Sequence, residues 1–88
     1  MRINHIAISE VVENKIIQEH GVWPEEVESI FFECRPLFLK ARDGRYLAIG
    51  TNNGYVTVVF EYMPGGIAQV VTAYPSSNWQ IKRYRRTK

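Results

Sequence analysis

The residues of this sequence best suited to chemistry are arginines and tyrosines in its second half. They are Arg42, Arg45, Tyr46, Tyr55, Tyr62, Tyr74, Arg83, Tyr84, Arg85 and Arg86. A guanidinium binds phosphate through paired donors, and an aromatic ring can stack on an unpaired base. The same residues also have structural uses, because tyrosine is common in strands and exposed cations keep sheet edges from aggregating. Nucleic-acid binding and a structural role therefore both remain open at this point.

The last eight residues, IKRYRRTK, concentrate this chemistry. Five of the eight are cationic, and Tyr84 lies among them. The segment is either a solvated tail that keeps the protein soluble or a contact to a phosphate backbone. Thr87 and Lys88 are expected to form a frayed end in both cases.

Charge is distributed unevenly along the chain. The first 34 residues hold seven acids and two bases, a net charge of −5, whereas the remaining residues hold nine bases and two acids, a net charge of +7. Such asymmetry favours a basic face for an anionic partner and an acidic face elsewhere. The alternative is that the two halves attract one another.

Other chemistries have little support in the sequence. There is no glycine-rich nucleotide loop and no cysteine or histidine cluster with metal-ligand spacing, so neither a metal nor another cofactor is expected. His20 stands where a helix is expected to end, and we interpret it as a cap of that terminus. Cys34 is the single cysteine, which excludes an internal disulfide and favours a small buried apolar residue.

Length and composition predict one globular domain spanning residues 1–88. The chain is 45% hydrophobic and has no apolar run near the roughly 18 residues of a membrane span. The opening residues lack the apolar stretch of a secretory signal, so a cytoplasmic location and no membrane association are expected. The sequence leaves the oligomeric state open, including a homodimer through a sheet edge.

Helix patterns occupy the first part of the chain, after a possible short strand at residues 3–8. Ser9 can cap a helix over residues 9–20, which Gly21 ends. A second helix begins at Pro24 and ends before Pro36. Trp23 precedes it, where a capping Ser or Thr is usual, and could act as a hydrophobic staple.

Strand patterns occupy the rest of the chain, at residues 37–42, 45–51, 55–63 and 67–74. Asp43-Gly44 suits a tight hairpin turn between the first two. Because a twisted antiparallel sheet must cover its apolar face, the two helices are expected to pack on it. The predicted class is α+β, with two N-terminal helices on an antiparallel sheet of four to five strands.

Three segments, KIIQEHGVWPEEVESIFFE, DGRYLAIGTNNGYVTVVFEY and VVTAYPSSNWQIKRYRR, together resemble the BrnT-like branch of the RelE/ParE toxin superfamily. The resemblance spans about residues 11–86. It implies the RelE-like fold and a bacterial type II toxin that cleaves RNA and is silenced by a partner antitoxin. Arg45 matches the arginine before the family's Ile-Gly strand, and Arg83 matches its basic C-terminal segment. The family commonly has arginine after its Ser/Thr-Ala pair, where this chain has Tyr74.

The catalytic hypothesis follows from how such toxins cleave RNA, with the substrate's own 2′-hydroxyl as nucleophile and no metal. Arg45 and Arg83 would bind phosphate, because a guanidinium stays charged and is a poor base. Tyr84 or Tyr74 would transfer the proton, and Arg42, Arg85 and Arg86 would hold the RNA. The main alternative is a non-catalytic domain on the same scaffold that binds RNA or another protein.

Overall fold

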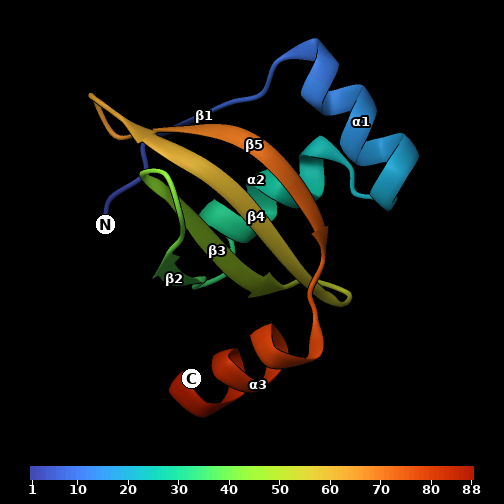
Figure 1. Cartoon of the computed structure of the whole chain (residues 1–88), viewed down its shortest axis with the longest axis vertical. Helices are drawn as coiled ribbons and strands as arrows, with labels where there is room; N and C mark the ends of the chain where they lie inside the picture. The colour runs from blue at the N-terminus through green and yellow to red at the C-terminus, as the bar shows by residue number, and fades with distance from the viewer.

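The computed structural model describes all 88 residues and contains three helices and one five-stranded sheet. In chain order the elements are β1 (His5–Ala7), α1 (Glu10–His20), α2 (Pro24–Phe32), β2 (Leu37–Lys40), β3 (Arg45–Thr51), β4 (Tyr55–Met63), β5 (Ile67–Pro75) and α3 (Asn78–Thr87). The sheet order is β1-β5-β4-β3-β2, with α1 packed against β5 and α2 against β3 (Figure 1). The predicted α+β class with two N-terminal helices on the sheet is confirmed. None of the three helices has the length and apolar character needed to cross a membrane.

The helix termini follow the local chemistry of the sequence. The Ser9 hydroxyl accepts from the Val12 amide at 3.1 Å, and Gly21 takes the left-handed conformation that ends α1. Trp23 makes no side-chain cap bond and is 53% exposed, so the staple expected there is wrong. Val22 occupies the staple position instead, since it is buried in the same core cluster as Val27.

The hairpin between β2 and β3 forms as predicted. Asp43 and Gly44 have φ values of 59° and 74°, the positive angles that a two-residue hairpin turn of this kind needs. Strand β2 ends at Lys40, two residues before the predicted end. The pairs β2–β3, β3–β4 and β4–β5 are all antiparallel.

Two features differ from the prediction. The first strand, β1, pairs with β5 in parallel, so the five-stranded sheet is mixed rather than wholly antiparallel. The C-terminal segment, for which no helix was predicted, forms α3. Both edge strands, β1 and β2, have only three and four residues, which limits pairing with another chain.

The main core lies between the sheet and the first two helices. Ile16, Ile30 and Phe31 from the helices meet Val58 and Phe60 from β4 in one buried cluster. The ring of Phe31 meets the ring of Phe60 edge to face, with centroids 5.1 Å apart. Gly50 lets α2 approach closely, because a Cβ there would lie 2.9 Å from Cδ1 of Ile30.

The opposite face of the sheet is covered by α3. Side chains alternate along β3, so Leu47 and Ile49 point away from Gly50 and α2. Both are buried, with Ile49 fully so, yet neither belongs to the main cluster. Because α3 contacts β3, the molecule has three layers, with α1 and α2 on one side of the sheet and α3 on the other.

Candidate nucleic-acid interface

A buried polar network attaches α3 to the sheet. Gln80 is 2% exposed, and its Oε1 accepts from the Thr57 hydroxyl at 2.9 Å and from the Ser77 amide at 2.9 Å. The hydroxyls of Thr57 and Ser76 lie 2.7 Å apart. Ser77 and Gln80 also form a capping box, which satisfies amides of the first turn. The start of α3 therefore has a fixed position on β4.

Tyr74 belongs to the same network. Its hydroxyl oxygen accepts from Nε2 of Gln80 at 3.0 Å. Its ring lies 6.0 Å from the ring of His20, centroid to centroid, at the end of α1. Since the phenol oxygen already accepts one hydrogen bond, its own proton is free to be donated elsewhere.

A second contact holds the later part of α3. The rings of Tyr84 and Tyr55 meet edge to face at 5.6 Å, and Nε of Arg85 donates to the Tyr55 hydroxyl at 3.1 Å. The Arg85 guanidinium also lies 5.6 Å from the centre of the Tyr55 ring. Tyr84 is half-buried, so its phenol is less accessible than the cations around it.

The remaining cations of α3 are exposed and uncompensated. Lys82, Arg83 and Arg86 are exposed, and no carboxylate lies within 4.0 Å of any cation of α3. The one ion pair of the molecule joins Arg45 and Glu61, both in the basic half of the chain. Attraction between the acidic and basic halves therefore does not account for the uneven charge.

Arg45 lies far from the cations of α3. It begins β3 and pairs in register with Glu61, whereas Tyr55, which Tyr84 contacts, pairs with Thr51 at the other end of the strand. Six residue steps along a strand span about 20 Å. Arg42 lies beside Arg45, since its carbonyl accepts from the Arg45 amide across the hairpin turn at 3.1 Å. Tyr74 therefore contacts the first turn of α3, whereas Tyr84 and Arg85 contact Tyr55 from its later part. Arg42 and Arg45 lie apart from both contacts.

The environment of Arg45 combines charge with an unfulfilled hydrogen-bond donor. Its Nε lies 3.7 Å from a carboxylate oxygen of Glu61, and this nitrogen is buried without a hydrogen-bond partner. About two fifths of the side chain is nevertheless exposed. The guanidinium can therefore still contact an anion from solution.

The two other prominent tyrosines have structural contacts. Tyr46 stacks on Phe60 with ring centroids 5.9 Å apart, and Tyr62 donates to the carbonyl of Arg2 at 3.0 Å. Cys34 is half-buried rather than fully buried, and its thiol donates to the carbonyl of Thr51 at 3.1 Å.

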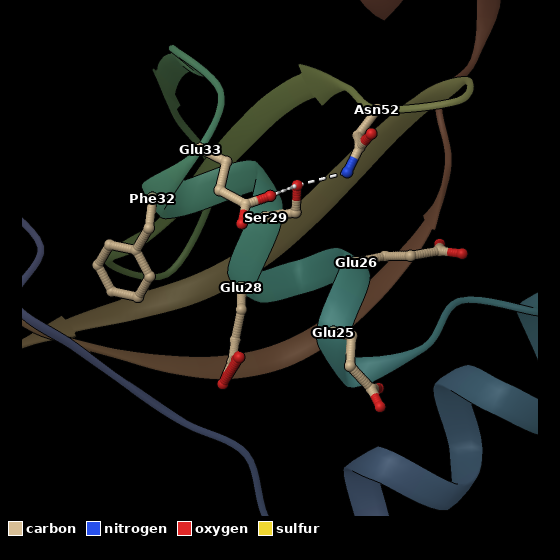
Figure 2. Close-up of a pocket in the computed structure, with 7 residues that line it drawn as sticks. All are labelled: Glu25, Glu26, Glu28, Ser29, Phe32, Glu33 and Asn52. Atoms are coloured by element: carbon tan, nitrogen blue, oxygen red, sulfur yellow. Dashed lines mark hydrogen bonds between the residues drawn. The ribbon is translucent and has the colours of Figure 1, made fainter.

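An acidic hollow lies on α2, on the other side of the sheet. It encloses about 450 Å³ and is lined by Glu25, Glu26, Glu28, Ser29, Phe32, Glu33 and Asn52. Figure 2 shows Asn52 donating to Ser29, which donates to Glu33 at 2.9 Å, while the other three carboxylates extend from the helix. Four glutamates repel a polyanion, so this hollow does not suit RNA.

Comparison with known proteins finds similarity at the level of structure. No family model matches the chain, and no curated protein matches it by sequence. The chain is similar to BrnT, the ribonuclease toxin of Brucella abortus, whose crystal structure was determined at 1.1 Å resolution. The TM-score is 0.71, and the match covers 84% of this chain and 97% of that chain. The chain has the BrnT fold.

Sequence identity in this match is 21%, so the likeness establishes the fold. The BrnT fold confirms the resemblance recognised from the sequence, since that resemblance also spanned most of the chain. The candidate site residues remain predictions, because the likeness does not test them.

His20 and Gln80, which both contact Tyr74, were not predicted to belong to the site. His20 and Tyr74 are 54 positions apart, and only the packing of α1 on β5 brings their rings together. Gln80 follows Ser77 by three residues, the Ser-x-x-Gln spacing of a capping box, so that part of the network could have been recognised.

Proposed function

We propose that this chain is a ribonuclease toxin of a type II toxin–antitoxin pair. The observation that supports it best is the likeness of 84% of this chain to 97% of a Brucella protein described as a ribonuclease toxin. Uncompensated cations on α3, across the sheet from the acidic α2, add a surface suited to a polyanion. A partner antitoxin and an RNA substrate follow from this proposal.

The proposed reaction is metal-independent cleavage by the 2′-hydroxyl of the substrate. The 2′-oxygen attacks the adjacent phosphorus and loses its proton, while the bond from phosphorus to the 5′-oxygen breaks and that oxygen gains a proton. The products are a 2′,3′-cyclic phosphate and a 5′-hydroxyl end. The protein must therefore supply a base, an acid and positive charge on the phosphate.

Tyr74, its neighbours and the residues of α3 provide groups for each of these tasks. Arg83 is exposed and can bind the phosphate that reacts. Tyr74 can donate a proton, since its oxygen accepts from Gln80, and His20 beside it can act as the base. Tyr84 is the alternative proton donor, with its ring against Tyr55.

The other cations serve substrate binding in this proposal. Arg45 and Arg42, about 20 Å along the sheet, would bind a different phosphate of the same RNA. Release of Arg45 from Glu61 would accompany that contact. Arg85 and Arg86 would add to the attraction at the end of α3.

The test is incubation of the pure protein with RNA in the presence of EDTA. We expect cleavage that leaves cyclic phosphate ends and that fails when the 2′-hydroxyl at the cut site is methylated. Arg45→Ala with Arg83→Ala should abolish cleavage, and Tyr74→Phe or Tyr84→Phe should lower it roughly 100-fold or more, whichever tyrosine is the acid.

Lys15→Ala is the matched control, because Lys15 is an exposed cation on α1. Cleavage unchanged by the double arginine replacement would show the site assignment to be wrong. RNA that stays intact with the unaltered protein would favour the alternative, a non-catalytic RNA-binding or protein-interaction domain. Harmless overexpression in bacteria, without a neighbouring gene for a small partner protein, would favour the same alternative.

A further inference from the structure

The side of α3 that faces away from the sheet carries one tryptophan and three cations. Gln80 and Tyr84 face the sheet. Trp79, Lys82, Arg83 and Arg86 are three, four and seven positions apart, so they lie along the other side of the helix. Trp79 is 56% exposed and the three cations are exposed. They form what we call the outer α3 surface.

Folding does not explain the outer α3 surface. Trp79 makes no ring contact with another aromatic side chain and lies under no arginine. The three cations have no carboxylate partner within 4.0 Å, and at these spacings they repel one another. These features suit a ligand that brings negative charge and a flat apolar face together.

We propose that the outer α3 surface binds single-stranded RNA, with Trp79 stacked on an unpaired base. Lys82, Arg83 and Arg86 then contact phosphates on either side of that base. Trp79 and Arg86 are two helical turns apart, about 11 Å along the axis, which leaves room for more than one phosphate contact. The inference rests on the proposed function for RNA as the ligand, but it does not require cleavage.

Other anionic surfaces fit this side of the helix less well. A duplex hides the faces of its bases, so Trp79 would have nothing to stack on. A membrane-binding helix needs a broad apolar face, whereas Trp79 is the single large apolar side chain here. Arg85 is excluded from the set because its Nε already donates to Tyr55.

Trp23 supplies a matched control. It is 53% exposed, nearly the same as Trp79, but it precedes the acidic α2 on the other side of the sheet. Binding is measured with a single-stranded 2′-O-methyl oligonucleotide, which lacks the nucleophile and cannot be cleaved by 2′-hydroxyl attack. We expect Trp79→Ala to weaken binding about tenfold, Trp23→Ala to have no effect, and Trp79→Phe to restore most of the affinity.

The cations are tested separately by salt dependence. Replacing Lys82, Arg83 and Arg86 by glutamine should reduce the slope of log affinity against log salt by about 2. Trp79→Ala should leave that slope unchanged, since it removes no charge. Circular dichroism of each variant shows whether α3 remains folded.

Several outcomes would overturn the inference. One is an equal loss of binding in the Trp79 and Trp23 variants. Another is that Trp79→Ala weakens binding of duplex RNA as much as binding of single-stranded RNA. Adsorption to phosphatidylserine vesicles through Trp79, without binding of the oligonucleotide, would assign the surface to membranes instead. Binding that is retained by a protein unable to cleave RNA would contradict the proposed function alone.

Discussion

Thr57 shows how a single hydroxyl can determine the position of a whole helix. It is fully buried on β4, and its side chain lies between Ser76 and Gln80, the residues that lead into α3. Groups buried in this way are costly when they lose a partner, because water cannot replace it. The attachment of α3 therefore depends on a hydrogen-bonded group rather than on apolar packing alone.

We expect Thr57→Val to lower the free energy of unfolding by about 1 to 3 kcal/mol. Valine keeps the shape of the side chain but leaves Gln80 Oε1 and Ser76 without their shared partner. Thr72→Val is the control, since Thr72 is a half-buried strand threonine without a side-chain hydrogen bond. Urea denaturation measures the unfolding free energy of both variants. Equal effects of the two replacements would contradict a special role for the network.

Residue types suggested the chemistry of the candidate site but not its geometry. The arginines and tyrosines could be selected from the sequence, because few other side chains suit phosphate and bases. The distance between Arg45 and α3 could not be predicted from the sequence, because it depends on which end of β3 the helix packs against. Arg45 and Arg83 therefore cannot be assumed to act on one phosphate.

At the scale of elements, the close contact between α2 and β3 depends on Gly50. Its missing side chain leaves room for Ile30, which is fully buried. Any larger residue at this position would push α2 from the sheet or force Ile30 from its preferred rotamer.

Gly50→Ala should lower the free energy of unfolding by about 1 to 3 kcal/mol through this clash. Ile30→Val alone should cost about 0.5 to 1.5 kcal/mol, because it leaves a small cavity. The double variant should lose less unfolding free energy than the sum of the two single losses, because valine lacks the Cδ1 atom that the new methyl group would meet. Thermal denaturation of all four proteins completes the cycle, and strict additivity would show that the clash is relieved elsewhere.

The elements were predicted well where caps and turns mark them. Ser9, Gly21, Pro24 and Asp43-Gly44 set element boundaries that the structure confirms. The third helix was missed because its sequence, NWQIKRYRRT, is dominated by polar and charged residues. Its sheet-facing side uses the amide of Gln80 and the ring of Tyr84, so a search for aliphatic spacing does not detect it.

At the scale of the whole molecule, the sheet separates two surfaces of opposite charge. The acidic hollow lies on α2, and the uncompensated cations lie on α3 across the sheet. Because no ion pair joins the two sides, this separation contributes little to folding. It is available to orient the molecule toward an anionic ligand.

Salt should therefore affect folding and binding very differently. Between 50 and 500 mM NaCl we expect the unfolding free energy to change by less than about 1 kcal/mol, since the one ion pair is partly exposed. RNA affinity should fall about 100-fold over the same range if three phosphates are contacted. Denaturation and filter binding in the same buffers compare the two. If salt lowered the free energy of unfolding as steeply as the free energy of binding, the acidic and basic surfaces would be shown to attract each other.

The parallel pairing of β1 with β5 also bears on how the chain is made. The partner of His5 in the sheet is Ile67, which is synthesised about 60 residues later. At about 5 to 20 residues per second, some 60 further residues take roughly 3 to 12 seconds to add. For that time the sheet lacks its fifth strand, and α3 follows later still. The basic surface is therefore completed only after all strands of the sheet have been synthesised.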